Sequence, residues 1–531
     1  MADLKLRRLV SSAFKLSGFT LRSEACSFLM VQLEPLSDGE RKEWLDNLTD
    51  NIQRQPLNSA TIEKEQVERA IQECCRSGAD DSEPILSVIS AFETPRFTYN
   101  VDRKKFTLIT GQPPEILGCA ADKARLFRNR FQIIHQRTAR HPLFAPSLSE
   151  TLGDLDENGE PRVKKYKLSP VEKLLCTSSR IANAVVLGML TQLKEGKFYI
   201  EDPTGAVQLD LSNASYHRGL HTDNGIVLVE GSYEDRILYV DGIGQPPAEL
   251  SKTSRAYFGN INTFGGPSET CLKNSAKLLK IEKSNEDGMI IFIADVWLDH
   301  LKVMEKLRAM FEGFLGCPPI AFVFMGDFLS GQLGASHCSE LRLKFKRLGE
   351  LLVQYPLLTE KCHFIFVPGP GDPAGPKILP RPPLPKFVTE ELLKRVPNAI
   401  MATNPCRLQY CTQEIVVIRE DLVTKMCRNN IHFPSDGEIP DHFARTIISQ
   451  AHLAPLPLSV CPVYWPMDSA LQLYPLPDLI VTADKFNSFS TAHMECQVMN
   501  PGSFPRSEFS FKVYVPSSKT VEDSQIPDEE D

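Results

Sequence analysis

Hydrophobic positions in the first 75 residues repeat with the spacing of amphipathic helices. The first of four such sets consists of Leu6, Leu9, Val10 and Phe14. Ser17-Gly18 separates the first two segments, and Ser37 to Glu40 has the form of a capping box that opens the third. The pattern predicts an all-α N-terminal domain over residues 1–75, in which no catalytic side chains can be identified. We therefore expect this domain to act through its surface, by docking to a protein partner.

Residues 76–165 have a mixed pattern that is bounded by polar segments, and they are predicted to form a linker or connecting region. Within this region, a basic stretch from Lys123 to His141 alternates arginines with phenylalanines and isoleucines. Such alternation favours a helix or a strand seam whose arginines face solvent. Arg128 and Arg130 remain possible nucleic-acid contacts.

From residue 166 to residue 275 the pattern changes to short alternating strands separated by turns. The expected strands are residues 183–190, 197–200, 206–211, 225–231 and 236–241. Asp202 to Gly205 is a typical turn, because proline fixes φ early and glycine accepts a positive φ late. Five such strands predict a small β-barrel that resembles an OB-fold. Phe198 and Tyr199 are possible platforms for nucleic-acid bases, although barrel core and interdomain packing is the favoured interpretation.

Residues 276–520 alternate apolar strands with helices, which predicts an α/β or α+β sandwich. The expected strands are residues 289–293, 320–325, 363–367 and 479–482, and helices are expected at residues 303–314 and 339–352. A proline-rich segment from Pro368 to Lys386 is predicted to be a stiff surface loop. The acidic tail over residues 521–531 is predicted to be disordered.

Polar residues follow each of these four strands, at the edge of a sheet where α/β proteins bind ligands. The arrangement resembles that of the calcineurin-like metallophosphoesterases, in which aspartates, histidines and an asparagine after the strands hold two divalent cations around a nucleophilic water. Asp295 and Asp327 match the two aspartates of that pattern. At the remaining positions the chain departs from it, with Trp297, Ser330, Pro370, Gly371, Asp484 and Phe486.

These departures remove metal ligands that a two-metal site needs. Indole, proline and phenylalanine side chains offer no lone pair to a metal, and the ammonium of Lys485 would repel a dication. Gly-Asp and Pro-Gly pairs after strands are also ordinary turn chemistry, so the likeness rests on four degraded motifs in the right order. The sequence therefore predicts a degenerate phosphoesterase site, with no catalytic residue, no metal and no cofactor.

Composition narrows the class of protein further. The chain has 531 residues, of which 42% are hydrophobic, and two to four domains are expected. Its 14 cysteines include no Cys-x-x-Cys pair, which favours free thiols in a reducing compartment. The formal charge of −8 argues against a protein that mainly coats nucleic-acid phosphates. No run of about 18 uncharged apolar residues is present, so membrane spanning is not expected.

A barrel followed directly by a degenerate phosphoesterase domain resembles the B-subunit family of replicative DNA polymerases. Residues 186–190, 198–205 and 324–327 are similar to that family, and the helical N-terminal domain points to its epsilon branch. The resemblance implies a nuclear, non-catalytic accessory subunit that binds the cysteine-rich C-terminal domain of the catalytic subunit of DNA polymerase epsilon. It also implies histone-fold accessory subunits as partners, a link from residues 1–75 to the GINS component of the replicative helicase, and indirect contact with DNA. The basic segment from Arg162 to Lys167 could serve as a nuclear import signal.

Two other functions stay open at this point. One is a single-stranded nucleic-acid-binding module that uses the barrel aromatics and the stretch from Lys123 to Arg140. The other, which the sequence favours least, is an active metallophosphoesterase with unorthodox ligands such as His300 or Asp372.

Overall fold

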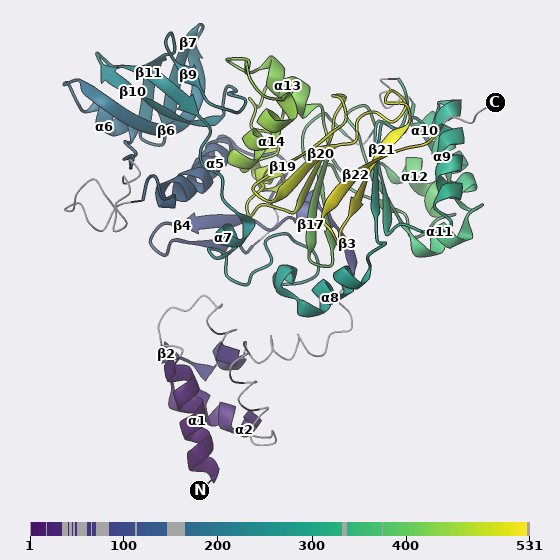
Figure 1. The fold of residues 1–531 in the computed structure, drawn as a ribbon, viewed down its shortest axis with the longest axis horizontal. Helices are drawn as coiled ribbons and strands as arrows, with labels where there is room; N and C mark the ends of the chain where they lie inside the picture. Colours follow the sequence, from purple (N-terminus) through teal and green to yellow (C-terminus); the bar gives the residue numbers. More distant parts are fainter. Residues whose placement is uncertain are drawn as a thin grey trace.

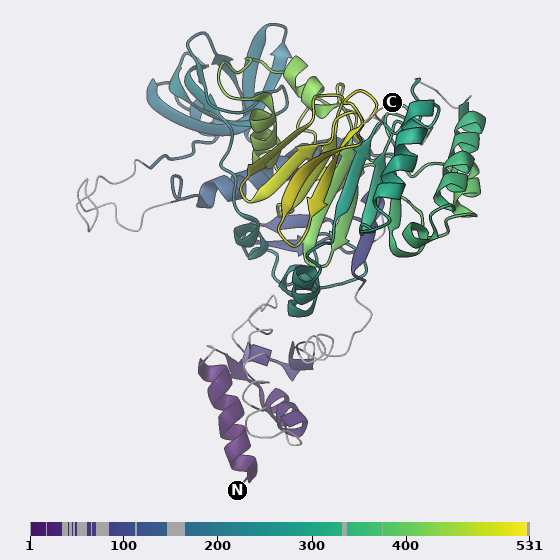
Figure 2. The ribbon, with the colours of Figure 1, turned by 45° about the vertical axis from the view of Figure 1, so that its right-hand side comes forward.

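The computed structural model describes residues 2–16, 19–33, 41, 45, 48–49, 52, 61–64, 66–68, 70, 84–111, 114–145, 165–331, 337–373 and 375–527. Figure 1 shows a barrel at one side, an α/β sandwich at the centre and right, and a separate N-terminal unit below them. In the rotated view of Figure 2 the N-terminal unit again stands apart from the rest of the chain. No helix among the described residues is long and apolar enough to cross a membrane.

The N-terminal unit contains helices α1 (Ala2–Leu16) and α2 (Ser23–Leu33). It also contains two short strands, β1 (Thr20–Leu21) and β2 (Thr61–Ile62), which pair in parallel. The described part of this unit is therefore mainly helical but not all-α. The capping box expected at Ser37 and the Ser17-Gly18 break lie outside the described residues. One apolar cluster joins the four predicted segments, and it includes Val10, Phe14, Ala25, Leu29, Leu45, Leu48, Ile52 and Val67.

The connecting region is part of the folded body. Strand β3 (Leu86–Ser90) pairs antiparallel with β16 (Cys406–Tyr410) at the edge of the sandwich. A hairpin, β4 (Phe97–Asn100) and β5 (Lys105–Leu108), follows it, and then the long helix α5 (Ala120–Arg140). The aromatic rings of the hairpin pack on Phe258, with the Phe106 and Phe258 ring centroids 4.3 Å apart. Residues 84–111 and 114–145 thus pack between the barrel and the sandwich, in a region where the sequence predicts a linker.

The barrel agrees closely with the expected strands. It comprises β6 (Ile181–Lys194), β7 (Lys197–Asp202), β8 (Gly205–Asp210), β9 (Ser215–Tyr216), β10 (Ile226–Glu234) and β11 (Ile237–Gly244). Strand β10 pairs with both β6 and β11, and this second pairing closes the sheet. The predicted turn lies between β7 and β8, where Asp202 pairs with Gly205 and its Oδ1 accepts a hydrogen bond from the Thr204 amide at 2.7 Å.

The sandwich consists of two six-stranded sheets. One has the order β15-β14-β13-β12-β21-β22, and the other has the order β19-β20-β18-β17-β16-β3. The first sheet is built from β12 (Ile290–Ala294), β13 (Ala321–Met325), β14 (His363–Val367), β15 (Ile400–Met401), β21 (Ser510–Val515) and β22 (Thr520–Gln525). The second adds β17 (Gln413–Arg419), β18 (Leu479–Ala483), β19 (Phe489–His493) and β20 (Cys496–Asn500) to β16 and β3.

Helices cover the outer faces of both sheets, which gives four layers (Figure 2). A fully buried core lies between the sheets, and a second core packs the first sheet under α9 (Leu301–Gly313), α10 (Cys338–Leu352) and α12 (Lys386–Leu393). A third core packs the other sheet under α13 (Leu422–Arg428) and α14 (Ile439–Ser449). The expected strands and helices of this region match within two residues at each end. The prediction of an α/β sandwich is confirmed in the described residues.

The prediction of a disordered tail is wrong for the part of it that the structure describes. Strand β22 pairs with β21 along its whole length, Lys512 of β21 forms an ion pair with Asp523, and Ile526 is buried. Residues 528–531 lie outside the described residues.

The proline-rich segment, predicted to be a surface loop over the crevice, is exposed at residues 375–377 and borders the opening outside Asp327. Leu379 and Arg381 within it are buried, so only part of the segment lies on the surface.

Candidate functional site

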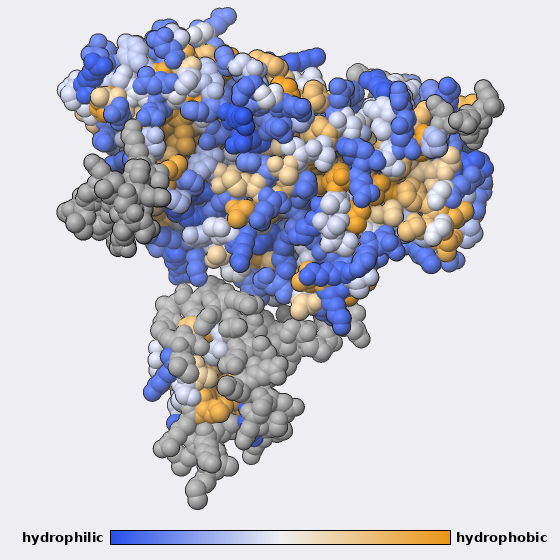
Figure 3. All heavy atoms as spheres, viewed as in Figure 1, coloured by the Kyte–Doolittle hydropathy of each residue, from blue (hydrophilic) through white to orange (hydrophobic). Residues whose placement is uncertain are grey.

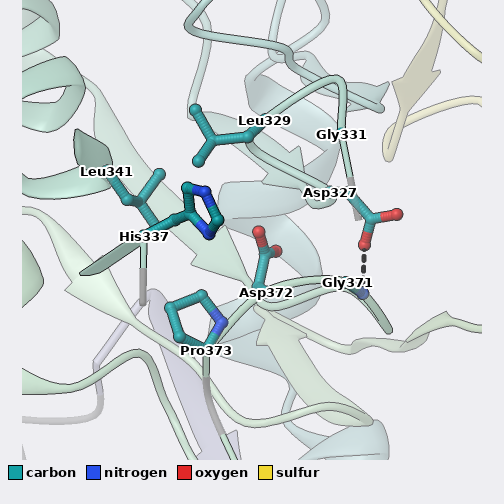
Figure 4. A pocket seen from close by; sticks show the side chains of 8 residues that line it. All are labelled: Asp327, Leu329, Gly331, His337, Leu341, Gly371, Asp372 and Pro373. Carbon is teal, nitrogen blue, oxygen red and sulfur yellow. Dashed lines mark hydrogen bonds between the residues drawn. The ribbon is translucent and has the colours of Figure 1, made fainter. Parts of the chain in front are cut away.

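Residues that follow β12, β13, β14 and β18 lie around a crevice at the ends of these strands. Asp295 comes directly after β12 and adopts a left-handed backbone conformation with φ +56°. Asp327 follows β13, and its Oδ1 accepts a hydrogen bond from the Gly371 amide at 2.7 Å (Figure 4). Gly371 fits closely here, because a Cβ at this position would lie 3.0 Å from the Asp327 carboxyl carbon.

An arginine that the sequence analysis did not identify occupies the centre of this crevice. Arg419, the last residue of β17, is fully buried. Its Nη2 donates to Asp295 Oδ1 at 2.7 Å, and its Nη1 donates to Asp421 Oδ1 at 3.0 Å. The same guanidinium lies 4.0 Å from Asp327 and donates to the backbone oxygens of Gly326 and Ala483.

The charge of Arg419 is stable in this setting. Burial by itself would lower the pKa of its guanidinium, but Asp295, Asp327 and Asp421 raise the pKa above its ordinary value. A fixed positive charge therefore lies among carboxylates that would otherwise repel one another. The sequence signal was the arginine that directly follows an apolar run, Ile415 to Ile418, and directly precedes Glu420 and Asp421.

The carboxylates of Asp372 and Asp484 accept hydrogen bonds from backbone amides. The Asp372 oxygens accept from the amides of Phe328 at 2.9 Å and Gly369 at 2.7 Å. Burial, and secondly the neighbouring Asp327, raise the pKa of Asp372 to about 7. Asp484 accepts from the amide of Val423, in the first turn of α13, and from that of Phe486, each at 2.8 Å. Burial raises the pKa of Asp484 to about 6.

The other departures from the two-metal pattern also have packing or hydrogen-bonding partners. Trp297 packs at the edge of the second core, with the Arg506 guanidinium 5.2 Å from its ring. Phe486 packs against the third core, 6.3 Å from the ring of Phe489. The Ser330 amide and hydroxyl both donate to Asp299, at 2.9 and 2.6 Å.

Two pockets among the described residues border the crevice. A small pocket beside Asp327 and Asp372 is closed by His337, Leu341 and Pro373 (Figure 4). A wider opening of about 270 Å³ lies outside Asp327 and is bordered by Pro370, Arg381, Asp421 and Lys485. Most of its border charges are paired internally, as Lys485 is with Asp421 at 3.5 Å and Lys425 is with Glu420 at 3.0 Å. Among the described residues, no group of three or more His, Cys, Asp or Glu side chains is arranged to hold a metal ion.

The predicted nucleic-acid residues do not form one site. Arg130 is buried and forms an ion pair with Asp468, and the Arg130 Nε donates to Asp468 Oδ2 at 3.1 Å. The prediction that Arg130 contacts nucleic acid is therefore wrong, because its charge is already compensated inside the protein. Arg128, two residues earlier on α5, is exposed. Phe198 packs against the barrel core, and Tyr199 is half-buried on the same strand.

The barrel is fixed to the sandwich by polar side chains of α14 and the residue after it. The Ile226 amide donates to Gln450 Oε1 at 2.9 Å, and Gln450 Nε2 donates to the Ile226 oxygen at 2.6 Å. The Leu220 amide donates to Thr446 Oγ1 at 2.8 Å, and the Gly219 amide donates to His442 Nδ1 at 2.9 Å. These bonds satisfy backbone groups of the loop before β10 and of Ile226 at the start of β10 with side chains of the sandwich, which fixes one relative orientation of the two domains.

Models of known protein families match three separate parts of the chain, which correspond to the N-terminal unit, the barrel and most of the sandwich. The family models that match describe the N terminus of DNA polymerases epsilon over residues 2–74, the OB-fold domain of proteins like DNA polymerase epsilon subunit 2 over residues 120–247, and the B subunit of DNA polymerases alpha and epsilon over residues 290–491. Barrel, sandwich and N-terminal unit together thus define a B-type accessory subunit of a DNA polymerase.

Individual relatives show to which family within this class the chain belongs. The chain is 51% identical over 530 residues to DNA polymerase epsilon subunit 2 of Homo sapiens, with 99% of each chain covered. It is 48% identical over 527 residues to the Drosophila melanogaster protein of that name, again with 99% of each covered. The identity to the B subunit of DNA polymerase epsilon from Saccharomyces cerevisiae is 28%, over 85% of this chain and 76% of that one. The chain belongs to the DNA polymerase epsilon subunit 2 family, which confirms the resemblance inferred from the sequence.

Solved structures give only a distant likeness. An archaeal phosphodiesterase is 12% identical with a TM-score of 0.25, and it covers 44% of this chain and 98% of its own. A protein of Thermus thermophilus is 11% identical with the same TM-score, over 45% of this chain and 99% of its own. At these scores the likeness carries no argument about the fold or the activity of this chain.

Proposed function

We propose that this chain is a non-catalytic accessory subunit of the DNA polymerase epsilon complex and acts in nuclear DNA replication. Its principal partner is the C-terminal domain of the catalytic subunit, and the barrel and sandwich present one rigid surface to it. The proposal rests on membership of the epsilon subunit 2 family over 99% of the chain. The hydrogen bonds from α14 to the barrel loop support the idea of a single rigid scaffold.

The degeneracy of the phosphoesterase-like site is part of this proposal. The observation that carries it is the buried guanidinium of Arg419, 2.7 Å from Asp295. A divalent cation held by Asp295 and Asp327 would have to displace this fixed charge or lie beside it, and like charges in a buried site repel strongly. Arg419 therefore takes the charge-compensating role that bound metals have in active phosphoesterases.

The catalytic part of the proposal is tested with the purified full-length chain and a phosphodiester substrate. We expect no hydrolysis above background with added manganese, and no difference between the native chain and an Asp327→Ala variant. Hydrolysis that depends on manganese and is abolished by Asp327→Ala would show that the crevice is an active site.

The partner part is tested by affinity purification of the tagged chain from nuclear extract after nuclease treatment. We expect a large polymerase catalytic subunit at one copy per chain, and histone-fold subunits with it. Co-purification of neither would leave the accessory role without support.

The N-terminal unit is proposed to link the polymerase to the replicative helicase. Its apolar side chains gather in one internal cluster, and no catalytic group is evident on its described residues, so a docking role remains for its surface. A chain that lacks residues 1–75 should still purify with the catalytic subunit and should lose the helicase components. Retention of the helicase by the shortened chain would place that contact elsewhere.

A further inference from the structure

The loop of residues 217–222, which lies between β9 and β10 of the barrel and is called the joint loop below, is held by the sandwich on two sides. One side is α14, as described above. On the other side, the amide of the buried His221 donates to Asn430 Oδ1 at 2.7 Å, and its oxygen accepts from the Ile431 amide at 2.8 Å. Both partners lie in the segment that follows α13. A buried histidine thus lies at the centre of the contact between the two domains.

A second buried histidine, His442 of α14, uses both of its ring nitrogens in this contact. Its Nδ1 accepts from the amide of Gly219 in the joint loop at 2.9 Å. Its Nε2 lies 2.6 Å from the backbone oxygen of Asp436, and because a carbonyl oxygen only accepts, Nε2 carries the ring proton. The geometry therefore requires the neutral ring, with one proton, on Nε2. A second proton would go to Nδ1, which already faces the Gly219 amide hydrogen.

His221 is held in the same protonation state. Its Nε2 donates to the His217 oxygen at 2.9 Å, and its Nδ1 lies 3.5 Å from the side-chain nitrogen of Gln245, which can only donate. Burial lowers the pKa of His221 below the ordinary histidine value of about 6.5. The bond to the His217 oxygen acts in the opposite direction, and positive charges on His217, His432 and His442 lower the pKa further.

The elements packed around the two rings supply no paired carboxylate. Their titratable or charged side chains are Tyr216 on β9, His217, Arg218 and Asp223 on or beside the joint loop, His432, Asp436 and Glu438 after α13, and Asp441 and Arg445 on α14. Arg218 and Asp436 pair with each other at 3.5 Å at exposed positions, and Asp441 accepts from the Thr491 hydroxyl at 2.5 Å. Among the described residues, neither His221 nor His442 forms an ion pair. An added proton on either ring is therefore an uncompensated buried charge.

We propose that the joint between barrel and sandwich is a pH-sensitive device, in which protonation of His221 and His442 releases the joint loop from the sandwich. A proton on His442 Nδ1 removes the acceptor of the Gly219 amide, and a proton on His221 places a charge inside the contact. Opening exposes both rings to water. The barrel then loses its attachment to α14, while α5 still connects the two domains. The proposal goes beyond the accessory role and does not depend on it.

Proton linkage makes acidic pH favour the open joint. The closed joint holds both rings neutral, whereas histidines exposed to water take up a proton below about pH 6.5, so the open state binds more protons there. The stability of the joint is complete above this pH and decreases as the pH falls below it. Uptake of one proton raises the opening constant up to about tenfold per pH unit, and uptake of two raises it up to about 100-fold.

The test is hydrogen exchange of the full-length chain, read by mass spectrometry between about pH 7.5 and about pH 5.5 and corrected for the intrinsic pH dependence of exchange. Peptides that contain the joint loop and Ile226 should lose protection about 10- to 100-fold between about pH 6.5 and about pH 5.5. Strands β7 and β8 of the barrel and β12 and β13 of the sandwich should stay protected, because opening leaves both cores folded.

Two substitutions remove the titration but keep a bond. In His442→Asn the side-chain oxygen can still accept from the Gly219 amide, and in His221→Gln the side-chain amide can still donate to the His217 oxygen. Each variant should show about half of the native slope of log protection against pH, and the double variant should show none. The matched control is His363→Gln in the first sheet, a half-buried histidine whose pKa burial also lowers, and it should keep the native slope.

Three results would overturn the proposal. The first is equal protection of the joint loop at the two ends of the pH range. The second is loss of protection in β12 and β13 together with the joint loop, which would mean that acid unfolds the whole protein. The native chain decides both of these without any variant. The third is the full native slope in the single variants, which would place the titrating groups elsewhere.

Discussion

At the scale of single residues, Arg419 compensates the charges of the aspartates in the crevice. The sequence places Asp295 and Asp327 after two neighbouring strands, as in a metal site. The structure brings a guanidinium to them from a third strand, and its distance to Asp295 Oδ1 is 2.7 Å. Carboxylates that are buried without a cation would destabilise the fold by several kcal/mol. Arg419 is therefore a structural residue, and its removal should affect stability first.

Replacing Arg419 with alanine should lower the free energy of unfolding by about 3–5 kcal/mol, because Asp295 is then buried without a partner. Urea denaturation followed by circular dichroism measures this change. Lys346→Ala is the control, since the exposed pair of Lys346 with Glu350 at 3.9 Å should contribute less than about 0.5 kcal/mol. Equal stability of Arg419→Ala and the native chain would refute the structural role of the arginine.

At the scale of elements, α5 acts as a joint between the barrel and the sandwich. Its buried face carries Arg130, paired with Asp468, and Arg137, which donates to the backbone oxygens of Ile448 and Ser449. Arg128 on the same helix faces solvent. The amphipathic pattern correctly predicts a helical seam here, but it assigns all the arginines to solvent.

This arrangement predicts opposite outcomes for two arginines that are two residues apart. Arg130→Ala leaves Asp468 buried without its ion-pair partner and should lower the free energy of unfolding by about 3–5 kcal/mol. Arg128→Ala should change it by less than about 0.5 kcal/mol, as is usual for exposed positions. Thermal melting of the two variants side by side measures the difference, and similar melting temperatures would contradict the buried pair.

The C-terminal strand offers a second prediction at this scale. A chain that ends after residue 518 loses β22 and the buried Ile526, and it exposes the ladder groups of β21. We expect such a chain to be less soluble and to melt at a lower temperature. A chain that ends after residue 527 keeps the strand and should match the native protein. An unchanged melting temperature in the shorter chain would show that β22 contributes nothing to the sheet.

At the scale of the whole molecule, the structure is a large folded body of barrel, connecting region and sandwich, with the N-terminal unit beside it (Figure 1). On the coloured part of the face drawn in Figure 3, polar side chains predominate and apolar side chains form separate patches. Besides α5, side chains of α14 and Gln450 join the sandwich to the barrel through hydrogen bonds to the loop before β10 and to Ile226 at its start. A polar joint of this kind fixes orientation more than it adds stability.

Gln450 is the residue on which this joint can be tested. Gln450→Ala leaves the amide and the oxygen of Ile226 without their side-chain partner, which should cost about 1–3 kcal/mol for each buried group. Hydrogen exchange should become faster at the start of β10 while the sandwich core stays protected. The control is Gln525→Ala, whose side chain bonds to Glu508 at the surface. Unchanged exchange at Ile226 would mean that the joint does not depend on Gln450.

The sequence by itself determined the elements of this protein and their order. Period-two and period-3.6 patterns located the barrel strands, the sandwich strands and helices such as α9 and α10 within a few residues, because each buries one face or both. The resemblance in the motifs also determined the family. The sequence also places Asp295, Asp327 and Gly371 at one edge of the sheet, because neighbouring parallel strands end at the same edge. In the structure these residues contact one another there.

Only the tertiary structure decided which charged side chains form ion pairs. Arg419 lies 124 residues from Asp295, and Arg130 lies 338 residues from Asp468, so no local pattern reveals either pair. The acidic strand β22 and the buried part of the proline-rich segment depend in the same way on partners from elsewhere in the chain. Hydrophobic periodicity is a local property of the sequence, whereas a buried charge is stabilised only by the group that the fold brings beside it.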